Sequence, residues 1–189
     1  MTIRPWRVLA SQVAFSHRWY TLRRDVVELP NGAVIDDYFV SVRPDIALVF
    51  ALTASGEIPL VRQYKHGAGE VTLELPAGTF RVGTEDPAEA AARELREETG
   101  YCCPRLDLIG VFLDDPTKNT SRVHAFLGEE AVREGPPELD RNEEAGLDVV
   151  LLPSAKLPEL LHRGEISAMS SVAAIYAALD VLRLRGKPM

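Results

Sequence analysis

Pro87-Ala-Glu-Ala-Ala-Ala-Arg-Glu-Leu-Arg-Glu-Glu-Thr-Gly100 is the stretch that decides the fold, because it predicts a helix with two chemically different faces. Asp86 is a good N-cap and Pro87 suits the first helical position. Glu89 stands three residues after the cap and completes a capping box, while Gly100 is a natural helix stop. The sequence therefore predicts a helix over residues 87–99.

The polar face of this helix carries the chemistry. Glu94, Glu97 and Glu98 share it at i,i+3 and i,i+4 spacings, so their like charges repel one another. A hard divalent cation such as Mg²⁺ or Mn²⁺ would resolve this conflict, because it prefers carboxylate oxygens and water. Arg93 stands one turn before Glu97 and is placed to hold that carboxylate. A solvated surface of mixed charge is the alternative explanation. An apolar stripe is predicted to face the core and consists of Ala88, Ala91, Ala92 and Leu95.

The segments around this helix predict strands before it and both strands and helices after it. Leu75-Pro-Ala-Gly78 ends a strand, and the loop 79–84 leads through Gly83 to the helix, so main-chain carbonyls can approach the polar face. An Asn31-Gly32 pair predicts a tight hairpin within residues 6–42. Strands are predicted at 6–42 around that hairpin, 45–53, 58–65, 71–75, 105–113, 121–127 and 147–152, and helices at 155–163 and 170–184. This order predicts an α/β sandwich with a mixed sheet.

The composition limits the function classes. The chain has 189 residues and a formal net charge of −7, which disfavours binding to nucleic acid or to an anionic membrane. Its apolar runs are too short to span a bilayer, and its first residues lack a signal-peptide core, so we expect a cytoplasmic protein. Cys102 and Cys103 are adjacent and are predicted to be packing residues.

Gly78, Glu85 and the run Arg93–Gly100 together resemble the Nudix box. The spacing Glu85–x7–Arg93-Glu94-x-x-Glu97-Glu98-x-Gly100 matches that signature throughout. Six residues separate Gly78 from Glu85 where the family has five. The resemblance implies a Nudix-type α/β/α sandwich with a mixed β-sheet and an N-terminal antiparallel β extension.

The resemblance also implies an activity, the hydrolysis of a nucleoside diphosphate linked to another group. It makes Glu94 and Glu98 metal ligands, with help from Glu97 and from the carbonyl of Ala77. Glu97, Glu98 and Arg93 are then the catalytic residues of the helix, with Arg93 and Glu85 supporting it. One to three Mg²⁺ ions, with Mn²⁺ as a possible substitute, would neutralise the diphosphate and orient a water molecule.

Further motifs resemble the ADP-ribose and nucleotide-sugar pyrophosphatase branch of the family. Val61-Arg-Gln-Tyr-Lys65 and Glu74-Leu-Pro-Ala-Gly78 are two of them, although the branch usually has Arg where Lys65 stands. A proline about fifteen residues after the box is the third. The substrate-binding residues implied are Arg43, Arg62, Lys65, Glu74, Pro116 and Arg122.

In this branch a β extension commonly builds a homodimer. Residues 1–42 are therefore predicted to be the dimerising extension and residues 43–189 the hydrolase domain. Trp19, Tyr20 or Arg43 could then reach a base or phosphate across the interface. The alternative is that these aromatic residues belong to the core or to a hairpin.

The general base is expected in the acidic loop 133–146, where Glu143 and Glu144 match the branch equally well. His124 is predicted to be a core histidine. The leading hypothesis is a pyrophosphatase of ADP-ribose or a nucleotide sugar, with a small-molecule nucleotide as its substrate. The alternatives are a house-cleaning hydrolase of damaged nucleoside triphosphates and a non-catalytic domain that senses ADP-ribose.

Overall fold

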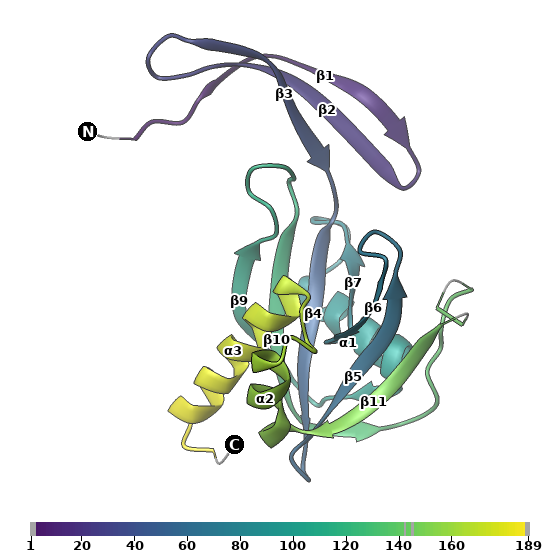
Figure 1. The fold of residues 1–189 in the computed structure, drawn as a ribbon. Coiled ribbons are helices and arrows are strands. Elements are labelled where there is room, and N and C mark those ends of the chain that lie inside the picture. Colours follow the sequence, from purple (N-terminus) through teal and green to yellow (C-terminus); the bar gives the residue numbers. More distant parts are fainter. Residues whose placement is uncertain (1–2, 142, 145, 188–189) are drawn as a thin grey trace. The chain divides into compact units, whose positions relative to one another are not determined.

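The computed structural model describes residues 3–141, 143–144 and 146–187 (Figure 1). The chain forms two compact units. One comprises Met1–Pro44 and Leu113–Arg122, and the other comprises Asp45–Phe112 and Val123–Met189. Each unit is described by itself below.

The N-terminal unit is built on an antiparallel sheet with the order β1-β2-β3. Its strands are β1 (Arg7–His17), β2 (Tyr20–Glu28) and β3 (Val34–Val42). The turn between β2 and β3 contains the predicted Asn31-Gly32 pair. Gly32 has φ +85°, a left-handed conformation that glycine adopts without steric cost, and its amide donates to the carbonyl of Leu29.

A distant loop, residues 113–122, belongs to this same unit. The amide of Ser41 in β3 donates to the carbonyl of Lys118 at 2.7 Å, and the amide of Thr120 donates back to Ser41 at 3.1 Å. The hydroxyl of Tyr38 donates to the carbonyl of Thr117 at 2.9 Å. The loop is thereby bonded to β3 along its length, an association that the sequence pattern does not predict.

The second unit contains a mixed sheet and an antiparallel sheet. The mixed sheet has the order β7-β4-β10-β8, with β9 also paired to β10, and β4 runs parallel to β10 and antiparallel to β7. The other sheet has the order β11-β5-β6. The strands are β4 (Asp45–Thr53), β5 (Glu57–Lys65), β6 (Glu70–Glu74), β7 (Ala77–Phe80), β8 (Tyr101–Cys102), β9 (Leu106–Leu113), β10 (Arg122–Arg133) and β11 (Leu147–Pro153).

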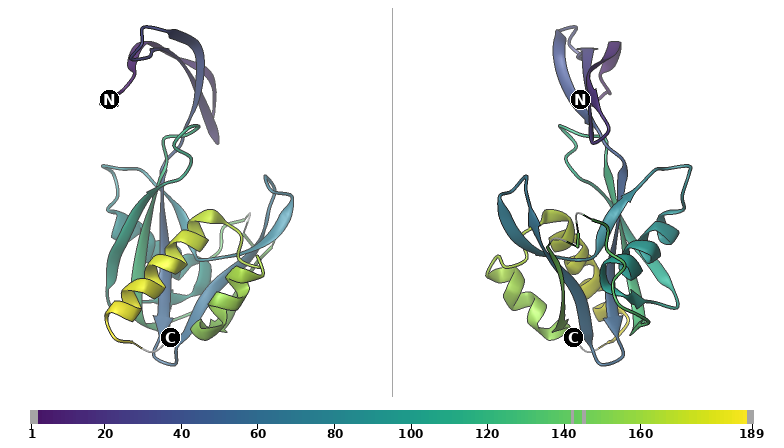
Figure 2. Two further views of the ribbon diagram at one scale, coloured as in Figure 1. Left: turned by 60° about the vertical axis from the view of Figure 1, so that its left-hand side comes forward. Right: turned by 90° about the vertical axis from the view of Figure 1, so that its right-hand side faces the viewer.

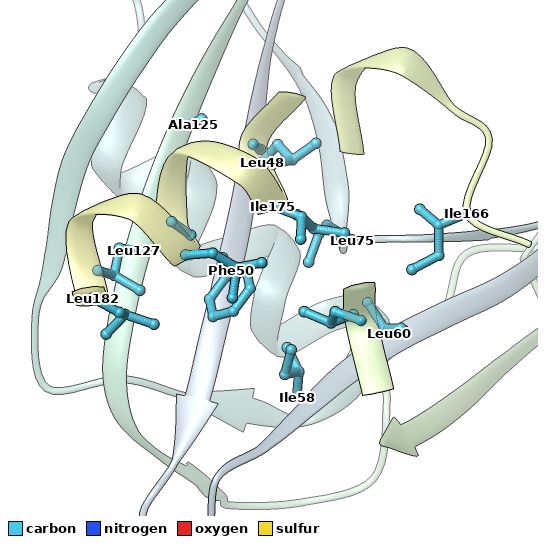
Figure 3. Packing of buried hydrophobic residues seen from close by; sticks show 14 of the residues in the cluster. Leu48, Phe50, Ile58, Leu60, Leu75, Ala125, Leu127, Ile166, Ile175 and Leu182 are labelled. Carbon is cyan, nitrogen blue, oxygen red and sulfur yellow. The ribbon is translucent and has the colours of Figure 1, made fainter. Parts of the chain in front are cut away.

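Helices cover both faces of the mixed sheet (Figure 2). They are α1 (Pro87–Thr99), α2 (Leu157–His162), which follows a 3₁₀ turn at Ser154–Lys156, and α3 (Met169–Leu184). Strand β4 explains this layering, because its side chains are buried alternately on both faces. Ala47 and Val49 pack with α1 residues, whereas Leu48 and Phe50 pack on the other side with Ile175 of α3. The larger cluster also takes in Ile58 and Leu60 of β5 (Figure 3).

The α/β class with a mixed sheet and flanking helices is confirmed. The helix over 87–99 and the two helices near the end of the chain are confirmed as well. Other predictions were wrong in detail. Thr79 and Phe80 belong to β7 and not to a loop, and the short strand β8 was not predicted. Ala92 is exposed and Ala90 is buried in its place, because several alanines in one turn define the apolar direction poorly. Within the described residues, no helix is long and apolar enough to cross a bilayer.

Candidate active site

The helix α1 is fixed at both ends by its own sequence. The side chain of Asp86 accepts a 2.8 Å hydrogen bond from the amide of Ala88. At the other end Gly100 has φ +74°, and its amide donates to the carbonyl of Arg96. A Cβ on Gly100 would also lie 2.2 Å from the carbonyl oxygen of Gly135, so only glycine allows the following segment to pack there.

The chain enters the site through Leu75 and Pro76. The buried hydroxyl of Ser171 in α3 accepts a hydrogen bond from the amide of Leu75 at 3.0 Å, and the carbonyl of Pro76 accepts one from Val49 of β4 at 3.1 Å. These bonds hold the start of β7 against α1. The amide of Ala77 then donates a 2.9 Å hydrogen bond to Oε2 of Glu98.

Glu98 and Glu94 are buried carboxylates, with only 3% and 9% of their surface exposed. Burial raises the pKa of Glu98 to about 8, and the nearby charges of Glu94 and Glu143 add to this effect. Burial likewise raises the pKa of Glu94, although Arg93 acts against it. Both carboxyl groups are therefore harder to ionise than an exposed glutamate, because burial removes the water that would stabilise the charge.

Arg93 links the acidic residues of the site. Its Nε donates to Glu85 at 3.0 Å, and its Nη1 donates to Glu94 at 2.7 Å and to Glu97 at 3.1 Å. These bonds, first of all the one to Glu85, raise the pKa of Arg93 further above its ordinary value. The guanidinium fork thus fixes three carboxylates at once, which a single ammonium group could not do in this geometry.

Gly78 leaves room for Glu94. A Cβ at this position would lie 1.9 Å from the carboxyl carbon of Glu94 and 2.0 Å from its Oε1. Even an alanine would therefore displace this carboxylate. The glycine places main chain directly against a buried acidic group, an arrangement that suits a site where carbonyl and carboxylate oxygens face the same ligand.

An open cavity of about 500 Å³ lies beside the acidic face of α1. Glu94 and Glu97 are among the residues of α1 that line it. Glu143 lines this cavity and its neighbour Glu144 does not, so of the two predicted bases only Glu143 faces the acidic helix. The lining also includes Ala77, Gly78, Thr79, Arg93, Glu138, Leu139 and Asp140.

The donor set fits a hard divalent cation. It consists of carboxylate oxygens and main chain, and burial raises the pKa of Glu94 and of Glu98, so a bound cation would favour their ionised forms. Within the described residues, no three His, Cys, Asp or Glu side chains are already grouped closely enough to hold a metal ion on their own.

Comparisons with known proteins agree with this geometry. The profile of the NUDIX domain matches residues 42–170. The chain belongs to the Nudix family. It is a Nudix hydrolase, an enzyme class that generally requires a divalent metal. A second profile, described as the nucleoside diphosphate sugar hydrolase N-terminal domain, matches residues 6–41.

Two curated Nudix relatives cover most of the chain. An ADP-ribose pyrophosphatase of Bacillus subtilis is 36% identical over 155 residues, which are 81% of this chain and 83% of the relative. An ADP-ribose pyrophosphatase of Mycobacterium tuberculosis is 31% identical over 172 residues, which are 91% of this chain and 82% of the relative. A crystal structure of an ADP compounds hydrolase superposes with a TM-score of 0.85 over the whole of both chains. At 21% identity, this last likeness shows the Nudix fold alone.

The predicted substrate-binding residues fall into two groups. Lys65 ends β5, pairs with Glu74 at 3.4 Å, and is near enough to Glu98 for its charge to lower the pKa of that carboxyl group. Arg62 is exposed on the same strand. The other group lies in the N-terminal unit and comprises Arg43, Pro116 and Arg122.

Arg43 and the loop of Pro116 are neighbours within the N-terminal unit. The amide of Arg43 donates to the hydroxyl of Thr120 at 3.1 Å, and its guanidinium lies 4.0 Å from Asp114. Trp19 and Tyr20 are exposed at the hairpin between β1 and β2 and so are not core residues. His124 is largely buried, contacts Asp45 at 2.9 Å and packs edge-on against Phe80, as expected of a core histidine.

Glu138 and Asp140 line the cavity but were not selected from the sequence. A signal for Asp140 was present, because Asp140 and Glu143 have the spacing of a capping box. No periodic pattern marks Glu138. Cys102 and Cys103 are free and partly buried, and burial raises the pKa of Cys103 to about 12, so its thiol is unreactive near neutral pH.

Proposed function

We propose that this Nudix hydrolase cleaves the diphosphate of ADP-ribose or of a related nucleoside diphosphate sugar. The observation that carries the proposal is the pairing of an acidic Nudix helix with an N-terminal segment that matches the nucleoside diphosphate sugar hydrolase profile. Both curated relatives described above are named ADP-ribose pyrophosphatase, which supports the same substrate class. The products would be a nucleoside monophosphate and a sugar phosphate.

The metal proposed is Mg²⁺, with Mn²⁺ as a substitute. Glu94, Glu97, Glu98 and the carbonyl oxygen of Ala77 would hold it, and when bound it would neutralise diphosphate charge and acidify the attacking water. Arg93 keeps the carboxylates in place through its bonds to Glu85, Glu94 and Glu97.

Glu143 is the proposed general base. A water molecule attacks one phosphorus atom, a new P–O bond forms, and the bridging P–O bond breaks, so that the bridging oxygen leaves with the other phosphate. Glu143 lines the same cavity as Glu94 and Glu97, and it accepts the proton that the water loses. Lys65, Arg62 and Glu74 are proposed to bind substrate, as are Arg43, Pro116 and Arg122 of the N-terminal unit.

A homodimer is proposed as the active assembly. Every residue of β1 is exposed in the single chain, including large apolar side chains such as Val8, Val13 and Phe15. Exposed apolar side chains favour burial against another protein surface, here the same strand of a second copy. Sedimentation equilibrium tests this: a monomer at micromolar concentration would contradict it, and Val13→Asp should weaken the dimer.

Product analysis after chelation and metal addition tests the activity. We expect EDTA to stop hydrolysis and Mg²⁺ or Mn²⁺ to restore it, with ADP-ribose or a nucleotide sugar preferred over NADH and dinucleoside polyphosphates. Unchanged rates in excess chelator would refute the metal assignment. Preference for oxidised nucleoside triphosphates would favour a house-cleaning enzyme, and binding of ADP-ribose without turnover would favour a sensor.

A further inference from the structure

The turn that carries Glu143 is closed by two reciprocal hydrogen bonds. The amide of Asp140 donates to Oε2 of Glu143 at 2.9 Å, and the amide of Glu143 donates to Oδ1 of Asp140 at 3.0 Å. This is the bonding pattern of a capping box, with Asp140 in the N-cap role and Glu143 three residues later. The amide of Leu147 then donates to the carbonyl of Glu143 at 2.9 Å, and the chain continues as β11. The box therefore shapes a single turn at the cavity.

The segment before this turn is fixed to the end of α1 by main-chain bonds. The amide of Glu138 donates to the carbonyl of Glu97 at 2.8 Å, and the amide of Glu134 donates to the carbonyl of Gly100 at 2.9 Å. Glu97 thus supports the segment with its main chain while its carboxylate faces the cavity. The position of Asp140 is consequently tied to the same helix that presents the metal-binding carboxylates.

Glu143 shares the cavity with the carboxyl groups of α1. Glu94 and Glu97 line the same cavity, and the charge of Glu143 helps to raise the pKa of both Glu94 and Glu98. A free glutamate on an exposed turn samples several rotamers, so a fixed orientation toward α1 needs a hydrogen-bond partner. The hydrogen bond from the amide of Asp140 fixes one carboxylate oxygen of Glu143.

We propose that Asp140 is a positioning residue whose side chain fixes the turn so that Glu143 faces the acidic helix. This inference rests on the proposed function, in which Glu143 is the general base. Asp140 itself does not need its charge for this role, because what Glu143 requires is a hydrogen-bond acceptor for its amide at the N-cap position. Asn and Ser provide such an acceptor, whereas Ala does not.

Steady-state kinetics of Asp140 variants with Mg²⁺ and ADP-ribose test the inference. We expect Asp140→Ala to lower kcat about tenfold with KM changed less than twofold, and Asp140→Asn to keep kcat within about threefold of the parent. Asp140→Ser, a second uncharged acceptor, should keep kcat as Asp140→Asn does, so these two variants still test the proposal if Asp140→Ala folds poorly. Equal losses in the Asn, Ser and Ala variants would overturn the proposal, because they would show that the carboxylate charge itself is needed.

A double variant separates this inference from the proposed function. If Asp140 acts through Glu143, Asp140→Ala should cause little further loss in a Glu143→Gln background. Full multiplication of the two losses would overturn the positioning role. Full activity of Glu143→Gln would instead refute Glu143 as the base, whatever the Asp140 variants show.

Discussion

The main-chain nitrogen of Ala77 donates a 2.9 Å hydrogen bond to the buried carboxylate of Glu98, which joins the first residue of β7 to the last turn of α1. This bond favours the ionised carboxylate, yet burial still raises the pKa of Glu98 to about 8. In the absence of a metal ion the group is therefore largely protonated at neutral pH. The strand holds the side chain in place, and a bound cation would supply the charge that ionises it.

Glu98→Gln should abolish turnover and leave the fold intact. Glutamine keeps an oxygen that can accept the bond from Ala77, but it cannot bind a cation as a carboxylate does. We expect kcat to fall by more than about a hundredfold, since even partners outside the coordination shell are worth 10- to 100-fold. Phosphate release measures the loss of kcat, and circular dichroism checks the fold. Glu159→Gln on α2 is the control, because it removes an exposed carboxylate. Full activity in Glu98→Gln would refute the metal assignment.

The stability of the metal-free protein should fall as pH rises from about 5 to 8. The pKa of Glu98 is about 8 in the folded chain and about 4.3 in an unfolded one, so between these values the unfolded state loses its proton first. This stabilising contribution is fully present below the unfolded pKa and is lost as pH rises through the folded pKa.

Thermal unfolding in EDTA measures this effect against Glu98→Gln, which cannot titrate at that position. The variant should be more stable than the parent by roughly 4 to 5 kcal/mol at pH 8, with the difference vanishing near pH 4. Mg²⁺ should raise the melting temperature of the parent and not that of the variant. A parent melting curve that does not move relative to the variant between pH 5 and 8 would contradict the burial of this carboxyl group.

Local signals predicted α1 and its acidic face well. Asp86, Pro87 and Gly100 fix the ends of the helix through neighbouring atoms, and the 3.6-residue period places Glu94 and Glu98 on one face. The prediction of the strand β4 was equally local, and its burial on both faces follows from its near-continuous apolar run.

Features that depend on distant contacts were not predictable in this way. The bond from Ala77 to Glu98 and the attachment of the loop 113–122 to Ser41 join segments far apart in the chain. Which of Glu143 and Glu144 lines the cavity depends on the conformation of one turn, because adjacent side chains on it point in different directions. The periodicity of apolar residues along the sequence carries no information on any of these three features.

Arg93→Lys should impair the enzyme although it keeps the positive charge. A lysine has one donor group at the end of a flexible stem and cannot bond to Glu85, Glu94 and Glu97 together. We expect the apparent affinity for Mg²⁺ and kcat to fall, together by about 10- to 100-fold. Activity measured over a range of Mg²⁺ concentrations separates the change in metal affinity from the change in kcat. An Arg93→Lys enzyme with parental metal affinity and kcat would show that the charge alone is sufficient.

Gly78→Ala should weaken metal-dependent activity through steric displacement. The added Cβ would lie 1.9 Å from the carboxyl carbon of Glu94, so either the Glu94 side chain or β7 must shift. Because the site depends on the placement of that carboxylate, we expect kcat to fall by about two orders of magnitude. Gly67→Ala is the matched control, since a Cβ at Gly67 meets no described atom within 4 Å, and it should be neutral. If Gly78→Ala were as active as Gly67→Ala under saturating Mg²⁺, the reaction would not depend on the position that Gly78 allows the Glu94 carboxylate to take.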